Sequence, residues 1–153
     1  MAHTEFRSFA SGMLRAFIGD AFVAAGLPPG DAATCATLMT EADLTGADAH
    51  GIFRLPQYVR RLKAGGFNSR PNITVHQSAP ATALVDGDDG MGHLVVAKTA
   101  ETAIELAREN GVAWVGCRNS GHAGAERVTL MFGRALVEPS LRRCTYWGRR
   151  KMP

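Results

Sequence analysis

The sequence predicts an α/β protein in which an N-terminal helical lobe precedes a strand–helix–strand unit. Two observations lead to this prediction: apolar residues recur at helical spacing through the first third of the chain, and two β-like runs flank a helical pattern over 83–117. The expected parts are a helical lobe over 1–70, the start of an α/β domain over 71–125 and a divergent basic tail over 126–153. Apolar residues in the tail follow neither the helical nor the strand period for long. We therefore expect the tail to be poorly ordered, with at most a short helix over 128–136.

Residues 4–26 are expected to form the first helix. Gly26 ends the pattern, and the prolines that follow it do not continue a helix. The apolar residues expected to face the core recur mostly at steps of three and four: Phe6, Phe9, Met13, Phe17 and Ile18.

The second helix is expected to run from Asp31, as its N-cap, to about Leu44, with Gly46 suited to its end. Its predicted buried stripe consists of Cys35, Leu38, Met39 and Ala42.

After a loop that carries His50, a third helix is expected from about Leu55 to the Gly65-Gly66 pair. Pro56 falls in its first turn, where a missing N–H is harmless. Its apolar face is predicted to contain Leu55, Tyr58, Val59 and Leu62, and its basic residues Arg60, Arg61 and Lys63 are predicted to face solvent.

Extended structure is expected next, over 72–76 and 83–85. A loop over 87–92 then leads into a helix from about Leu94 to Asn110, and 112–117 is predicted to be a buried strand. The helix between the two strands provides the crossover that parallel strands require.

The composition argues against several classes of function. Residues 1–125 contain 10 Lys+Arg and 12 Asp+Glu, whereas 126–153 contain 7 and 2, so the net charge of +3 comes from the tail. The body therefore offers no basic face for a nucleic acid, and we expect no nucleic-acid partner. No apolar run is long enough for a membrane span, and the first residues lack the apolar segment of a secretory signal. Three widely spaced cysteines without zinc or CxxC spacing complete the expectation of a reduced, cytoplasmic protein.

Two histidines in polar, Gly-flanked segments are the main candidates for chemistry: His50 within 47–51 and His122 within 118–124. An imidazole titrates near neutral pH, so these residues point to proton transfer. His122 follows the predicted buried strand, and α/β proteins often place ligands at the carboxyl ends of strands. A surface histidine without a role is the alternative.

Arg54 follows His50 by four residues. A guanidinium beside an imidazole suits a carboxylate substrate, because the first group binds the carboxylate and the second moves the adjacent proton. Local pairing of Arg54 is the alternative. His3, His76 and His93 lack such neighbours, and His93 is expected simply to open a helix.

The glycine-rich segment between the strand and the helix resembles a dinucleotide fingerprint only superficially. Its spacing is G-x-x-G-x-G rather than G-x-G-x-x-G, and its aspartates would repel a pyrophosphate. A tight turn is the better interpretation of Gly87, Gly90 and Gly92.

Asp43, Asp48 and His50 have the side-chain types of metal ligands. No second cluster accompanies them, and Asp43 lies near a helix end, where carboxylates commonly stay solvated. We expect no metal.

Three segments, in the same order along the chain, resemble the malate/L-lactate dehydrogenase family of the non-Rossmann type. They are Glu41–Gly51 continued by Arg54–Tyr58, Val85–Gly92, and Arg118–Gly124, and the resemblance covers about residues 5–125. The family includes ureidoglycolate and sulfolactate dehydrogenases, diketogulonate reductase and reductases of cyclic imino acids.

The resemblance implies hydride transfer between NAD or NADP and a 2-hydroxy/2-oxo acid or a cyclic 2-imino acid. It implies His50 and His122 as proton donors or acceptors, Arg54 as the ligand of a small carboxylate substrate, and a homodimer with a fold that is not Rossmann. The cofactor contacts are expected mostly beyond the end of this chain.

Two departures from the family pattern affect these expectations. Ala49 stands where many members have Ser, and the pattern stops near Ala125, which suggests a truncated or frameshifted version. The chain is therefore expected to be an incomplete oxidoreductase that is inactive in isolation. The alternative is a catalytically inactive remnant or small binding protein that retains the N-terminal lobe.

Overall fold

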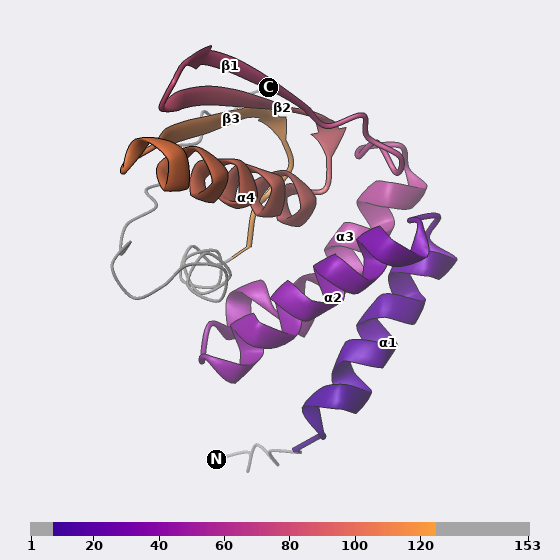
Figure 1. The fold of residues 1–153 in the computed structure, drawn as a ribbon. Coiled ribbons are helices and arrows are strands. Elements are labelled where there is room, and N and C mark those ends of the chain that lie inside the picture. The colour runs from indigo at the N-terminus through magenta and orange to yellow at the C-terminus, as the bar shows by residue number, and fades with distance from the viewer. Residues whose placement is uncertain (1–7, 125–153) are drawn as a thin grey trace.

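The computed structural model describes residues 8–124, which form four α-helices and a three-stranded sheet (Figure 1). The elements are α1 (Ser11–Ala24), α2 (Pro29–Leu44), two 3₁₀ turns (Asp48–His50 and Ile52–Arg54), α3 (Leu55–Lys63), β1 (Thr74–Ala79), β2 (Thr82–Gly90), α4 (Gly92–Asn110) and β3 (Trp114–Ser120). The predicted α/β class and the helix–strand order are confirmed.

The sheet has the order β1-β2-β3, with β1 antiparallel and β3 parallel to the central strand. Val85 of β2 lies opposite Val75 on one side and Cys117 on the other. Since β2 and β3 are parallel, α4 is the crossover between them, as the strand–helix–strand pattern predicts.

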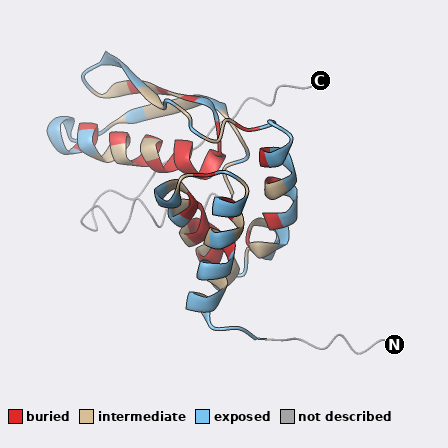
Figure 2. Cartoon of the chain, turned by 90° about the vertical axis from the view of Figure 1, so that its right-hand side faces the viewer, coloured by how far each residue is buried: buried red, intermediate tan, exposed pale blue. Residues whose placement is uncertain are grey.

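Helix α4 packs on one face of this sheet. Alternate residues of β2 are buried, and a Cβ added at Gly87 would stand 2.6 Å from a methyl group of Val95. Buried positions recur along α4 (Figure 2). Gly111 ends the helix in the left-handed conformation, at φ +80°.

One hydrophobic core joins the N-terminal helices to the start of α4. Ile18, Phe22 and Met39 are fully buried, and Met91 and Leu94 belong to the same cluster. Two regions that are distant in sequence are therefore fixed against each other by apolar burial.

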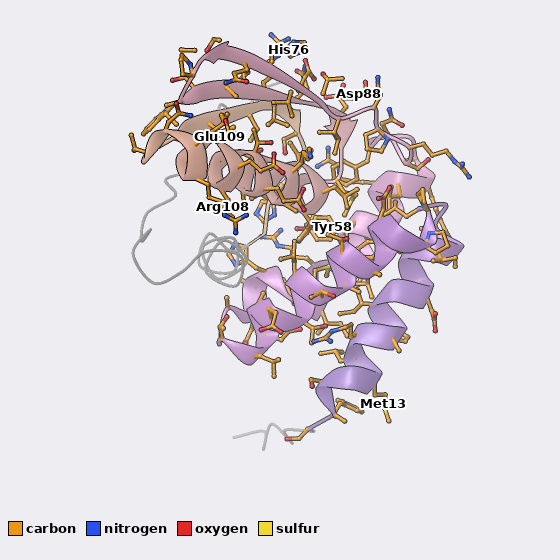
Figure 3. The ribbon with its side chains drawn as sticks, in the orientation of Figure 1. Met13, Tyr58, His76, Asp88, Arg108 and Glu109 are labelled. Atoms are coloured by element: carbon orange, nitrogen blue, oxygen red, sulfur yellow. The ribbon has the colours of Figure 1, made fainter. Side chains whose placement is uncertain are left out.

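The face predicted for the first helix is correct for Ile18, which is buried, but wrong for Phe9, Met13 and Phe17, which are 59–66% exposed. Phe22, which was not predicted, is buried beside Ile18. Met13 projects from the outer end of α1 (Figure 3). Residues 4–7, including the predicted core residue Phe6, lie outside the described residues.

A close approach of two helices explains which face is buried. A Cβ at Gly19 would lie 3.8 Å from the Cβ of Ala36, so α1 and α2 meet at small residues. Apolar residues recur at helical spacing on two faces of α1, and this contact selects the face that carries Ile18 and Phe22.

Two local predictions in this part of the chain also need correction. Helix α2 begins at Pro29 without a side-chain cap, and Asp31 lies in its first turn, where a carboxylate suits the helix dipole. Strand β2 reaches Gly90, so much of the expected loop over 87–92 is strand.

The predicted buried strand is half exposed, because β3 is the edge strand of the described sheet and α4 covers only one face. Trp114 is 64% exposed, and β3 includes residues 118–120, which were expected in a loop.

No helix within residues 8–124 is long and apolar enough to cross a bilayer. The predictions of a poorly ordered tail over 126–153 and of a short helix over 128–136 lie outside the described residues.

The two faces of α1 can be distinguished by a matched pair of truncations. We expect Phe22→Ala to lower the free energy of unfolding by about 3–5 kcal/mol, because it leaves a cavity in the core. Phe17→Ala should change it by no more than about 0.5 kcal/mol, because that ring faces water. Urea unfolding of the full chain measures both values, and equal losses would contradict the observed face.

Candidate active site

The two candidate histidines lie together. The rings of His50 and His122 are stacked, with centroids 5.4 Å apart and planes inclined by 14°. His50 ends the first 3₁₀ turn and is half-buried, whereas His122 follows β3 and is exposed. The fold thus brings the two Gly-flanked segments to one place.

Asp43 holds the segment that carries His50. Its carboxylate accepts a hydrogen bond of 2.9 Å from the amide of Ile52, and a Cβ at Gly51 would overlap the same carboxylate. Burial raises the pKa of Asp43, partly offset by the Ile52 amide. Asp43 is therefore partly buried rather than fully solvated, because the chain after α2 folds back over this side chain.

The His122 segment rests on the start of α4. A Cβ at Gly92 would overlap the carbonyl groups of Gly121 and His122, and the Gly121 amide donates to the Gly90 carbonyl at 3.1 Å. A Cβ at Gly121 would also stand 2.5 Å from the ring of Phe67. These glycines admit neighbouring parts of the protein itself, and this packing fixes the backbone at His122.

Two donors are directed at Nδ1 of His122. The Tyr58 hydroxyl lies 2.8 Å from this nitrogen, and the amide of Gly124 donates to it at 3.2 Å. An amide N–H can only donate, so Nδ1 must accept. Burial raises the pKa of Tyr58 to about 12, against smaller lowering by Arg54, so the phenol keeps its proton and also donates. The network therefore assigns the proton of neutral His122 to Nε2.

Arg54 makes local contacts. Its Nε donates to the Ala49 carbonyl at 2.9 Å, and its Nη1 donates to Oε1 of Gln57 at 2.8 Å. The first bond ties the end of the second 3₁₀ turn, just before α3, to the residue before His50, so Arg54 stabilises the segment that it follows. Local pairing, the alternative for this residue, is observed.

Two residues of the site were not recognised in the sequence. Tyr58 was expected only as part of an apolar helix face, and His93 only as a residue that opens a helix. Tyr58 lies between α4 and the N-terminal helices (Figure 3), and its ring contacts that of His93 in a T-shaped arrangement at 5.4 Å. The available signals were a hydroxyl on an otherwise aliphatic face and a histidine inside the apolar run 91–97.

His93 is 1% exposed, and neither of its ring nitrogens has a hydrogen-bond partner among the described residues. Burial, with smaller contributions from the nearby His122 and His50, lowers its pKa to about 4. His93 is therefore neutral at physiological pH.

The acidic turn at the end of β2 is satisfied by its own neighbours. The Asp86 carboxylate accepts hydrogen bonds from the side chains of Asn119 and Arg118 and from the Asp88 amide, and these contacts, led by Asn119, lower its pKa. Asp88 and Asp89 lie within the range of β2 but have φ of 49° and 54°, and the pairing of β2 with β3 shifts register between Asp86 and Gly90. The segment is thus an irregular, turn-like bulge inside the strand rather than a separate loop.

Within residues 8–124, no three His, Cys, Asp or Glu side chains are grouped so that they could hold a metal ion. Of the ligand types noted in the sequence, Asp43 is directed at the Ile52 amide.

Replacement of Tyr58 by Phe tests the assignment of the His122 proton. Without the hydroxyl, the Nδ1 ¹⁵N resonance of His122 should lose part of its hydrogen-bonded shift, and the ring should begin to sample the Nδ1–H tautomer. Loss of one buried hydrogen bond should lower the free energy of unfolding by about 0.5–1.5 kcal/mol. Long-range ¹H–¹⁵N correlation spectra provide the measurement, with His76 on β1 as the unaffected control. An unchanged His122 signal would refute the assignment.

Two helical glycines form a second matched pair. Gly92→Ala should destabilise the fold by about 1–3 kcal/mol, because the new methyl group overlaps the backbone of the His122 segment. Gly19→Ala should stabilise it by about 0.5–1 kcal/mol, because its methyl group would make an ordinary contact and alanine favours the helix. Thermal unfolding of both variants checks the opposite signs, and stabilisation by Gly92→Ala would be inconsistent with the packing described.

Comparison with known proteins identifies the group to which these segments belong. The family model for malate/L-lactate dehydrogenase matches residues 9–131. The L-sulfolactate dehydrogenase of Methanocaldococcus jannaschii is 44% identical over 99 residues, which cover 65% of this chain and 29% of that protein. The ureidoglycolate dehydrogenase (NAD(+)) of Escherichia coli strain K12 is 37% identical over 101 residues, which cover 66% of this chain and 29% of the relative.

Solved structures agree with the sequence comparison. The malate dehydrogenase of Pyrococcus horikoshii OT3 superposes with a TM-score of 0.79 at 34% identity, over 82% of this chain and 36% of that one. This chain thus spans about a third of the length of its relatives or less. The resemblance carried by the three segments is confirmed, and the chain belongs to the malate/L-lactate dehydrogenase family.

Proposed function

We propose that this chain supplies the substrate-side residues of an NAD- or NADP-dependent oxidoreductase. The reaction transfers a hydride to or from C2 of a 2-hydroxy/2-oxo acid or of a cyclic 2-imino acid. The observation that carries the proposal is the stacked pair of His50 and His122, one of them held by Tyr58. Family membership supports the class of reaction.

The histidines account for the proton in this reaction. Reduction of a 2-oxo acid adds a hydride to C2 and a proton to the oxygen, and oxidation reverses both. The nicotinamide, when bound, supplies or accepts the hydride. His122, with its proton on Nε2, donates a hydrogen bond that stabilises negative charge developing on the substrate oxygen. His50 serves as the general acid or base beside it.

Arg54 is proposed as the ligand of the substrate carboxylate. Its contacts with Ala49 and Gln57 commit two of the five guanidinium N–H donors. The remaining donors leave the planar group able to bind an oxyanion, and the committed ones hold it beside the segment of His50. The local pairing is therefore compatible with a substrate-binding role.

The glycine-rich segment over 87–92 does not fit the phosphates of a dinucleotide. Gly87 is closed by Val95, and a Cβ at Gly90 would stand 2.8 Å from Pro71. The aspartates of the same segment add negative charge. We therefore propose that residues outside this segment bind the cofactor's phosphates, and both NAD and NADP remain candidates. We further propose a cytoplasmic homodimer acting on a small carboxylate, without a nucleic-acid or membrane partner.

NAD(P)H fluorescence titration of the full chain tests the enzyme against the alternative of an inactive remnant or small binding protein. Binding and turnover of 2-oxo acids or a cyclic 2-imino acid are expected for the enzyme. His50→Ala and His122→Ala should then each reduce kcat/KM by about a hundredfold or more, as for the loss of general acid–base catalysis. His76→Ala, on the exposed strand β1, is the control.

Absence of cofactor binding at millimolar NADH and NADPH would favour the non-catalytic alternative for this chain. Activity that survives both histidine substitutions would overturn the assigned roles.

A further inference from the structure

His93 differs from the other buried polar residues of the described structure. Thr40, Thr99 and Thr102 each donate a hydrogen bond to a carbonyl of their own helix, at 2.7–2.9 Å. His93 makes no comparable bond to a described residue, although both ring nitrogens are buried. A buried polar group without a partner is costly, so this imidazole calls for an explanation.

The contacts of His93 single out the two residues that hold His122. Its ring meets the ring of Tyr58 at 90°, with centroids 5.4 Å apart. Gly124 also lies against this ring, since an added Cβ there would stand 3.0 Å from Nε2 of His93. Tyr58 and Gly124 are the same two residues whose donors are directed at Nδ1 of His122.

Charge plays no part in this arrangement. The ionisable groups that act on His93 are His122 and His50, and Arg54 and Arg61 act on the adjoining Tyr58. All of these oppose a further positive charge, as does the N-terminal end of α4, where His93 lies. His93 therefore contributes the shape of a flat, neutral ring.

We propose that His93 is a positioning residue for His122: its ring is wedged between Tyr58 and Gly124 and keeps both donors directed at Nδ1. The catalytic meaning of this role rests on the proposed function, whereas the positioning itself does not. An aliphatic side chain of similar size would remove two unpartnered polar atoms, so stability alone does not account for a histidine here. The edge of a flat ring, held between the phenol of Tyr58 and the backbone at Gly124, does account for it.

The test uses the full chain and needs neither cofactor nor turnover. The Nδ1 ¹⁵N resonance of His122 is measured in the wild type and in His93→Leu, His93→Ala and Tyr58→Phe, the last of which defines the signal without one donor. His93→Leu nearly preserves the volume but lacks the flat edge. Leu106→Ala, a buried truncation near the other end of α4, is the matched control for loss of stability.

Both His93 variants should move the His122 resonance at least half of the way to its position in Tyr58→Phe, and Leu106→Ala should leave it in place. Thermal unfolding should show His93→Leu to be at least as stable as the wild type. A wild-type His122 signal in His93→Leu would overturn the proposal, since His93 would then only fill space. An equal shift in Leu106→Ala would overturn it as well. If His93→Ala does not fold, His93→Leu alone decides.

The same experiments separate this inference from the proposed function. A shift of the His122 resonance in His93→Leu, in a chain that binds no cofactor, would support the positioning role while contradicting the proposed enzyme. Turnover with an unchanged signal in His93→Leu would do the reverse.

Discussion

The contact on which the rest of this structure depends is the seating of the start of α4 in the core of the N-terminal helices. Met91 and Leu94 are buried with Ile18, Phe22 and Met39, so apolar burial fixes where the helix begins. Gly92, between the two anchors, supports the backbone of the segment after β3. The same few residues therefore determine where the sheet lies, where the crossover starts and where His122 stands relative to His50.

The site is built by contacts of the protein with itself. Gly51 makes room for the Asp43 carboxylate, Gly92 for the His122 backbone and Gly121 for the Phe67 ring. At each of these positions the lack of a Cβ lets a neighbouring group pack closely against the backbone, and this packing restricts the movement of the segment. The small residues around the histidines thus give rigidity to the pair, which a proton-transfer site needs because a hydrogen bond tolerates little misplacement.

Much of this arrangement could be predicted from the sequence, and what could not has identifiable physical reasons. Helical spacing and the Gly and Pro boundaries were sufficient for α2, α3, α4 and the parallel pair of β2 and β3. Periodicity was not sufficient for α1, because two of its faces are apolar. The contact of Gly19 with Ala36 determines which of the two faces is buried. The apolar run 112–117 is typical of a buried strand, but whether a strand is buried depends on what packs beside it, and most of this run lies in β3 at the edge of the described sheet.

The same distinction applies to the site. His50 and His122 were recognisable as candidates because each lies in a polar, glycine-flanked segment, where an imidazole is accessible to a substrate. Tyr58 and His93 were not, since each sits in a sequence pattern that packing alone explains. Their importance comes from a long-range coincidence, the meeting of α3, α4 and the turn after β3, and no local pattern encodes such a meeting.

The outer edge of β3 has a consequence for how the molecule behaves in solution. This edge pairs with no strand among residues 8–124, so its backbone donors and acceptors form a template for another extended chain. Trp114 stands on this strand with most of its indole in water, and Val112 lies just before it. Whatever segment pairs there must adopt a register fixed by β3, and the fluorescence of Trp114 would report its arrival.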